Sequence, residues 1–183
     1  MTAPNLFFKQ FNRNRFFVES GSCEGAGIQN AIDSGFTYIY SVELAEYYYT
    51  YCQGRFHGVG NVKLFHGDSI KHLWNMIKDI NEPITFWLDG HSSGGKTAKG
   101  EGYKIDGFPV FEELAIISKH PVKTHVILID DISPTPDGAW VKEIEAEIMK
   151  INPLYRIRYE RGAQPEGYIL IADVFGEEAV KHG

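Results

Sequence analysis

Short apolar runs alternate with polar, glycine-containing segments along most of the chain. Five of these runs are rich in β-branched and aromatic residues and predict strands: Phe16–Ser20, Tyr38–Leu44, Asn61–Phe65, Ile84–Leu88 and Val126–Ile129. Between and after them, apolar residues three or four positions apart predict helices over 27–34, 45–53, 70–80, 109–118 and 136–149. Strands that alternate with helices predict a parallel sheet covered by helices on both faces.

Two further runs, Tyr155–Tyr159 and Tyr168–Val174, close the pattern without a helix between them. The connection at 160–167 is short enough for a hairpin. We therefore expect an α/β fold of the Rossmann-like kind: a three-layer sandwich around a mostly parallel seven-stranded sheet with a C-terminal antiparallel hairpin. Residues 1–183 should form one domain, with residues 1–15 as an N-terminal arm that covers a sheet edge.

Residues 90–108 interrupt the pattern with a glycine-rich, polar stretch. This stretch is too long for an ordinary connection, which predicts a functional loop or lid. The tryptophans Trp74, Trp87 and Trp140 occupy apolar positions and are expected in the core.

The composition restricts the class of protein. Of the 183 residues, 43% are hydrophobic and 23% are charged, as in a globular, water-soluble protein. The net charge of −6 argues against a general nucleic-acid binder. No apolar run approaches the roughly 20 residues of a membrane span. The chain start lacks a secretory signal, and two cysteines make no disulfide framework, so we expect a cytoplasmic protein with neither a membrane nor a nucleic-acid partner. A homo-oligomer stays open.

The first predicted strand ends in a turn that contains Gly21, Gly25 and Gly27 and precedes a helix. Glycine lets the chain turn tightly and lets backbone N–H groups approach a nucleotide-like ligand. An ordinary strand-to-helix turn that happens to use glycine would look the same in a single sequence.

Polar residues stand at the end of every predicted parallel strand. In chain order they are Glu19, Glu43, Asp68 with Ser69, Asp89, and Asp130 with Asp131. Parallel strands end at the same edge of a sheet, where ligands bind in such folds. Each acid could instead cap the helix that follows it. Their accumulation therefore indicates a site more strongly than any one of them does.

The spacing Glu19-x-Gly21-x-x-x-Gly25, followed by Glu43 and by Gly67-Asp68 after the next two strands, resembles the class I S-adenosylmethionine-dependent methyltransferases. The seven-stranded plan with its final hairpin is similar to their fold, and the likeness covers about residues 16 to 175. The resemblance implies that the turn from Glu19 through Gly21 to Gly25 holds the methionine part of the cofactor.

The same resemblance implies roles for the later strand ends. Glu43 would bind the ribose hydroxyls, and Asp68 with Ser69 would bind the adenine edge. Asp89 would also belong to the cofactor-binding residues.

Within that superfamily, Asp89 and the pair Asp130-Asp131 are similar to the metal ligands of the metal-dependent O-methyltransferases of catechol and caffeoyl type. The resemblance implies Mg²⁺ held by these three residues and methylation of a small-molecule hydroxyl, catechol-like or sugar-like. Carboxylates on strands about 4.8 Å apart suit a hard divalent cation, which lowers the pKa of a hydroxyl. The lysine base of that subgroup is replaced by Ser92, so we take His91 as the general base, with Asp89 as its catalytic partner.

Two alternatives stay open. Gly90–Thr97, GHSSGGKT, matches the phosphate-loop pattern G-x-x-x-x-G-K-[ST], and Asp130 could then serve as its magnesium partner. Such a loop needs a helix that starts at Lys96-Thr97, whereas the residues from Ala98 onward are rich in glycine. The second alternative is a non-catalytic module that binds a cofactor and whose acids are only helix caps.

Overall fold

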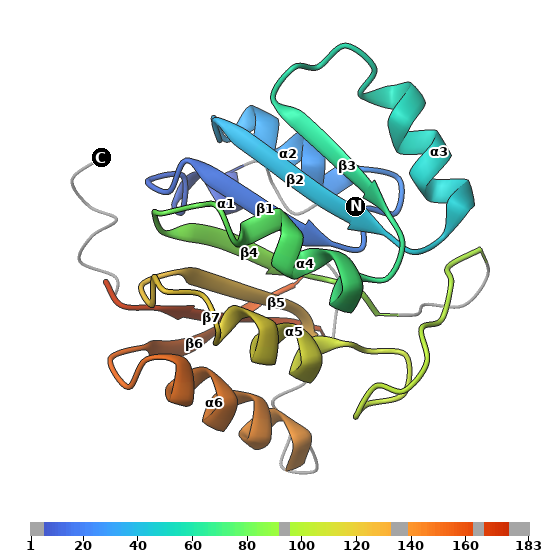
Figure 1. The fold of residues 1–183 in the computed structure, drawn as a ribbon. Coiled ribbons are helices and arrows are strands. Elements are labelled where there is room, and N and C mark those ends of the chain that lie inside the picture. Colours follow the sequence, from blue (N-terminus) through green and yellow to red (C-terminus); the bar gives the residue numbers. More distant parts are fainter. Residues whose placement is uncertain (1–5, 92–95, 133–138, 163–166, 176–183) are drawn as a thin grey trace.

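A seven-stranded mixed sheet runs through the centre of the protein (Figure 1). The computed structural model describes residues 6–91, 96–132, 139–162 and 167–175. The strand order is β3-β2-β1-β4-β5-β7-β6, with β1 to β5 parallel and β7 antiparallel to both β5 and β6. The expected mostly parallel sheet and its C-terminal antiparallel pair are confirmed. The strands are β1 (Phe16–Ser20), β2 (Tyr38–Glu43), β3 (Val62–His66), β4 (Ile84–Leu88), β5 (Val126–Ile132), β6 (Arg156–Arg161) and β7 (Tyr168–Asp173).

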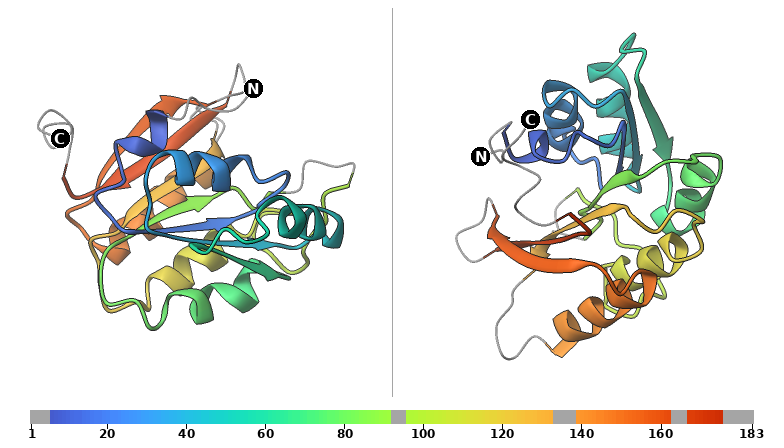
Figure 2. Two further views of the ribbon diagram at one scale, coloured as in Figure 1. Left: turned by 90° about the horizontal axis from the view of Figure 1, so that it is seen from above. Right: turned by 90° about the vertical axis from the view of Figure 1, so that its left-hand side faces the viewer.

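Helices cover both faces of the sheet, which gives the three expected layers (Figure 2). One face packs against α4, α5 and α6, and the other packs against α1, α2 and α3. Within the described residues, no helix combines the length and apolar character that crossing a membrane requires. The helices are α1 (Leu6–Lys9), α2 (Ala26–Asp33), α3 (Glu46–Arg55), α4 (Ser69–Ile77), α5 (Val110–Ile117) and α6 (Ala139–Ile151).

The alternation of side chains along the central strands divides the core between the two faces. In β1, Phe17 enters the layer with α2, whereas Val18 enters the layer with α4 to α6. In β4, Trp87 enters the layer with α2, whereas Phe86 enters the layer with α4 to α6. Both faces are therefore buried, which explains why β4 is a continuous apolar run in the sequence.

Two expectations about the core need correction. In its described part, residues 6–15, the N-terminal arm packs on a face of the sheet and not along an edge, because the Phe8 ring lies 5.0 Å from the rings of both Phe17 and Trp87 on the central strands. Trp74, which was expected in the core, is 39% exposed. Its neighbour Leu73 takes the fully buried position of α4 instead.

Two buried histidines connect the end of α5 with the starts of β4 and β5. The Ile84 N–H donates to His125 Nδ1 over 3.1 Å, so the proton of the neutral ring belongs on Nε2. His125 Nε2 lies 3.1 Å from His120 Nδ1, and His120 Nε2 lies 3.0 Å from the Ile80 carbonyl oxygen. Every ring nitrogen thus has a partner while both rings are neutral. Burial lowers the pKa of His125 to about 3.

This arrangement predicts a loss of stability in acid. Between the ordinary pKa of 6.5 and about 3, the unfolded chain binds a proton on His125 that the folded protein does not bind. The free energy of unfolding should therefore fall by up to about 1.4 kcal/mol for each pH unit below about 6. His125→Asn keeps an acceptor for the Ile84 N–H and should lack this slope in urea denaturation at several pH values. The exposed His57→Asn is the control, and equal pH dependence of the wild type and His125→Asn would contradict the prediction.

Candidate functional site

A cavity of about 140 Å³ opens at the carboxyl ends of β1 to β4. The strand order reverses between β1 and β4, which is the place where open α/β sheets bind ligands. Of the predicted cofactor residues, Gly21, Glu43, Ser69 and Asp89 line this cavity. Tyr103, from the segment that precedes α5, contributes to the wall as well.

The glycine turn crosses directly over the end of β4. Gly21 has a φ of +83°, and a Cβ there would lie 2.4 Å from the carbonyl oxygen of Asp89. The Gly21 N–H donates to the Val42 carbonyl oxygen over 2.9 Å, and the Asp89 N–H donates to that of Ser20 over 3.1 Å. The turn is thereby joined to both neighbouring strands. Gly25, with a φ of +77°, caps the start of α2 behind the cavity wall.

Glu19 lies beneath the turn and supports it from below. It is 1% exposed, accepts a hydrogen bond from the Ser41 hydroxyl, and places Oε1 where a Cβ on Gly27 would stand. Ser22 extends this buried network through a 2.6 Å contact between its hydroxyl and that of Ser41. Burial raises the pKa of Glu19 to about 8, so the carboxyl group is protonated at neutral pH.

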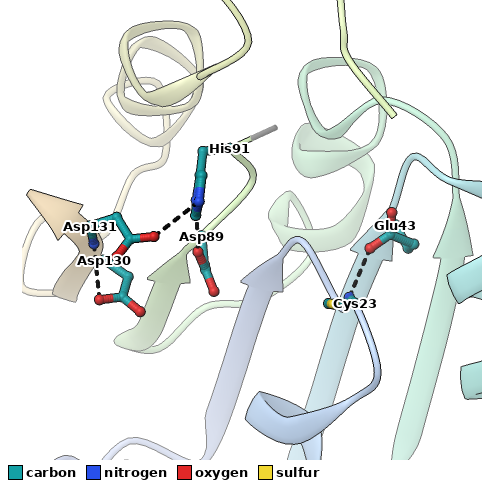
Figure 3. A network of polar contacts seen from close by, with 6 residues as sticks. All are labelled: Cys23, Glu43, Asp89, His91, Asp130 and Asp131. Atoms are coloured by element: carbon teal, nitrogen blue, oxygen red, sulfur yellow. Dashed lines mark hydrogen bonds and ion pairs between the residues drawn. The ribbon is translucent and has the colours of Figure 1, made fainter. Parts of the chain in front are cut away.

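Glu43 stands at the end of β2 and faces the cavity (Figure 3). One carboxylate oxygen accepts the Cys23 N–H over 2.9 Å, and the other accepts the Ala45 N–H over 2.7 Å. The turn and the start of α3 therefore hold the carboxylate in place. A carboxylate has about four acceptor positions, so Glu43 can accept further hydrogen bonds from hydroxyl groups in the cavity.

Residues 96–108 of the predicted loop or lid lie against the cavity and are held at both α3 and α4. The Tyr103 hydroxyl donates to Asp68 Oδ1 over 2.9 Å, and the same oxygen caps α4 by accepting the Ile70 N–H. Lys96 lies 3.8 Å above the centre of the Tyr47 ring. Asp68 is thus a helix cap that also anchors the loop, while its neighbour Ser69 lines the cavity.

Asp89, His91 and Asp131 meet at the ends of β4 and β5 (Figure 3). His91 Nδ1 lies 3.1 Å from Asp89 Oδ1, and His91 Nε2 lies 2.9 Å from Asp131 Oδ2. The hydrogen bonds to Asp131 and Asp89 raise the pKa of His91 to about 10. Each residue offers one ligand atom within 4.8 Å of the others, and carboxylate and imidazole ligands suit a divalent cation. A protonated ring cannot accept a proton, so the base role of His91 stays a prediction.

A β-bulge decides which aspartate reaches His91. β5 continues past its expected end at Ile129, and its register with β7 shifts just beyond that residue. Asp131 there has a φ of +55°, which re-aims its side chain. Asp130, a predicted metal ligand, instead accepts the Asp131 N–H over 2.9 Å and stays outside the group of three. Burial raises the pKa of Asp130 to about 7.

The phosphate-loop alternative lacks its helix in the described part of the chain. Residues 92–95 of the pattern lie outside the described residues. From Lys96 to Pro109 the chain contains no helix, and α5 begins only at Val110. The helix N-terminus that helps such a loop hold phosphates is therefore missing where the pattern requires it.

The polar residues at the cavity that sequence reasoning missed include Ser20, Tyr103 and Glu113. Ser20 and Tyr103 line it, and Glu113 is fully buried behind it. Tyr103 sits in an aperiodic loop and carries no sequence signal. Glu113 did carry a sequence signal, because it is an acid within the apolar stripe of α5, which contains Val110, Leu114 and Ile117.

The close approach at Gly21 predicts a specific loss of stability. Gly58→Ala introduces the same strain, since its φ is +78°, but nothing lies within 4 Å of the added Cβ. That control should cost about 1 kcal/mol of unfolding free energy. Gly21→Ala should lower the free energy of unfolding by about 1–3 kcal/mol more than the control does, because the added atom overlaps the Asp89 backbone. Equal losses for the two variants in urea denaturation would show that the contact with β4 is not restrictive.

Comparison with known proteins gives a result at the level of structure. No family model matches the sequence, and no curated protein sequence matches significantly. The solved structures that are similar include an O-methyltransferase from Bacillus cereus in complex with S-adenosylhomocysteine, with 14% identity, a TM-score of 0.65, and coverage of 94% of this chain and 82% of that one.

Two others show how varied these neighbours are. Human methyltransferase-like protein 13 in complex with S-adenosylhomocysteine has 14% identity, a TM-score of 0.60, and coverage of 92% of this chain and 79% of that one. The Methanococcus jannaschii fibrillarin pre-rRNA processing protein has 12% identity, a TM-score of 0.57, and coverage of 90% and 68%. This chain therefore adopts the Rossmann-like fold of the class I S-adenosylmethionine-dependent methyltransferases.

Proposed function

We propose that this protein is an S-adenosylmethionine-dependent methyltransferase that methylates a hydroxyl group of a small molecule with the help of a divalent cation. One observation carries the proposal: Gly21, Glu43 and Asp89 line a single cavity at the point where the strand order reverses. The S-adenosylhomocysteine in two similar structures supports the choice of cofactor.

The cavity residues would divide the cofactor between them. When bound, S-adenosylmethionine supplies an electrophilic methyl group on a sulfonium centre. Gly21 keeps the turn clear of side-chain atoms beside the methionine part. Glu43 would accept the ribose hydroxyls with the acceptor positions that the Cys23 and Ala45 N–H groups leave unused. Ser69 lines the end of the cavity where adenine would lie.

The methyl acceptor would bind beside Asp89 and Asp131, the two carboxylates that would hold a cation next to His91. A divalent cation there supplies charge that lowers the pKa of a substrate hydroxyl. The Phe108 ring lies 6.3 Å from the rings of both His91 and Trp140. The Phe108 ring is 7% exposed and packs behind the group as an apolar support, so the choice between a catechol-like and a sugar-like acceptor rests on the resemblance alone.

His91 is our candidate for the general base. Both of its ring nitrogens contact carboxylates, which keeps the ring protonated at neutral pH. Turning Asp89 and Asp131 toward a cation would remove the contacts that raise the pKa of His91. The pKa of the ring would then fall, the ring would release its proton to solvent, and the neutral ring could accept the proton of the substrate hydroxyl.

A non-catalytic module remains the alternative. Several acids do serve as caps or supports, since Asp68 caps α4 and Glu19 supports the turn. Cofactor binding without methyl transfer to catechols or sugars would favour this alternative.

Glu43 provides the test of the cofactor site. Glu43→Ala removes an anionic acceptor from the cavity and should weaken S-adenosylhomocysteine binding at least roughly tenfold in calorimetric titration. Glu46→Ala, at an exposed position of α3, is the matched control. Titration with ATP-Mg²⁺ distinguishes the phosphate-loop alternative from the S-adenosylmethionine site. Unchanged affinity of Glu43→Ala, or binding of ATP alone, would contradict the cofactor assignment.

The cation is tested by chelation. Methyl transfer from S-adenosylmethionine to catechol should stop in EDTA and return with excess Mg²⁺. Asp89→Asn and Asp131→Asn should each weaken Mg²⁺ binding at least roughly tenfold, because each removes an anionic ligand. Asp106→Asn, whose side chain is 83% exposed and pairs with Lys99, is the control. Turnover that persists in EDTA would overturn the role of the cation and leave the cofactor assignment standing.

A further inference from the structure

Glu113 is a buried acid whose side chain has no role in the proposed function. It is 0% exposed, and neither carboxyl oxygen completes a hydrogen bond within the described residues. A buried polar group left without a partner is costly, and such a group calls for an explanation. The other four buried residues of α5 are apolar, so packing alone would favour an apolar residue at this position.

The groups that face Glu113 connect it to the cavity. Burial raises the pKa of Glu113 to about 7, while the Ser69 and Ser20 hydroxyls lie close enough to favour the ionised form. Both serines line the cavity, and the Ser20 hydroxyl also lacks a hydrogen-bond partner within the described residues. The acids Asp68 and Glu112 are the charged groups that act on it.

This placement determines what the serines can offer a ligand. A hydroxyl that donates its proton toward Glu113 presents only lone pairs on its other side. Ser20 and Ser69 would then act as acceptors at the cavity wall, with the ionised form of the Glu113 carboxyl group behind them. In a buried environment, such an arrangement interacts more strongly with a positive charge than the same groups would in water.

We propose that Glu113 is a positioning residue that acts through Ser20 and Ser69 to make the cavity prefer a positively charged ligand over a neutral one. The inference rests on the proposed function, in which the sulfonium cofactor carries one positive charge more than its thioether product. Preference for the charged form would favour release of the product after methyl transfer.

The experiment compares affinities within each variant. S-adenosylmethionine, S-adenosylhomocysteine and sinefungin, which has an amine in place of the sulfonium, are titrated calorimetrically into the wild type and Glu113→Gln. Glu113→Gln should weaken binding of the two charged ligands roughly tenfold more than binding of S-adenosylhomocysteine. Because the readout is a ratio of dissociation constants, a partly inactive preparation does not distort it.

Two further variants sharpen the test. Glu46→Gln removes the same charge at an exposed position of α3 and should change the ratio by less than about twofold. The double variant Ser20→Ala with Ser69→Ala keeps Glu113 and should lose the preference as Glu113→Gln does, which provides a second route if Glu113→Gln does not fold. An unchanged ratio in Glu113→Gln or in the double serine variant would overturn the inference alone. If the wild type binds none of the three ligands, the proposed function is overturned and this inference with it.

Discussion

The close passage of the β1 turn over the end of β4 is the constraint on which the site depends. Gly21 can approach the Asp89 carbonyl oxygen because it has no Cβ, and hydrogen bonds fix the turn to β2 while β4 is fixed to β1. β1 and β4 are neighbours only because the strand order reverses between them. The reversal places Glu43 and Asp89, which are far apart in the chain, around one cavity.

So many acids at one sheet edge are tolerated because their surroundings give them different charge states. Glu19 is buried and protonated, and its neutral carboxyl group serves the turn. Asp131 pairs with the protonated His91, which lowers the pKa of the aspartate. Glu43 receives two backbone N–H groups. Burial, pairing and backbone hydrogen bonds thus keep like charges from opposing one another at full strength.

Proteins with different described roles share the fold of this chain. An O-methyltransferase and a pre-rRNA processing protein share this fold at 14% and 12% identity. Function on a common fold resides in the residues attached to it. Around the candidate site of this protein lie the bulged end of β5, the aromatic pair of Phe108 and Trp140, and the segment that carries Tyr103.

Local pattern determined much of this protein in advance. Apolar periodicity located the strands and helices, and Ile84–Leu88 was placed at its observed limits because both of its faces are buried. The alternation of strands with helices along the chain, together with the polar residues at the strand ends, indicated the edge that holds the cavity. These features follow from neighbouring positions in the chain, whose side-chain spacing reports burial directly.

Tertiary structure alone decided what depends on contacts between distant segments. The bulge that turns Asp131 instead of Asp130 toward His91 arises from pairing with β7, about 40 residues further along the chain. The N-terminal segment that contains Phe8 packs on a sheet face and not along an edge, because the Phe8 ring contacts the Phe17 and Trp87 rings there. Glu19 became a support and not a cavity residue because Ser41 and Gly27 enclose it. Such outcomes depend on which groups meet in space, and spacing along a single chain does not contain that information.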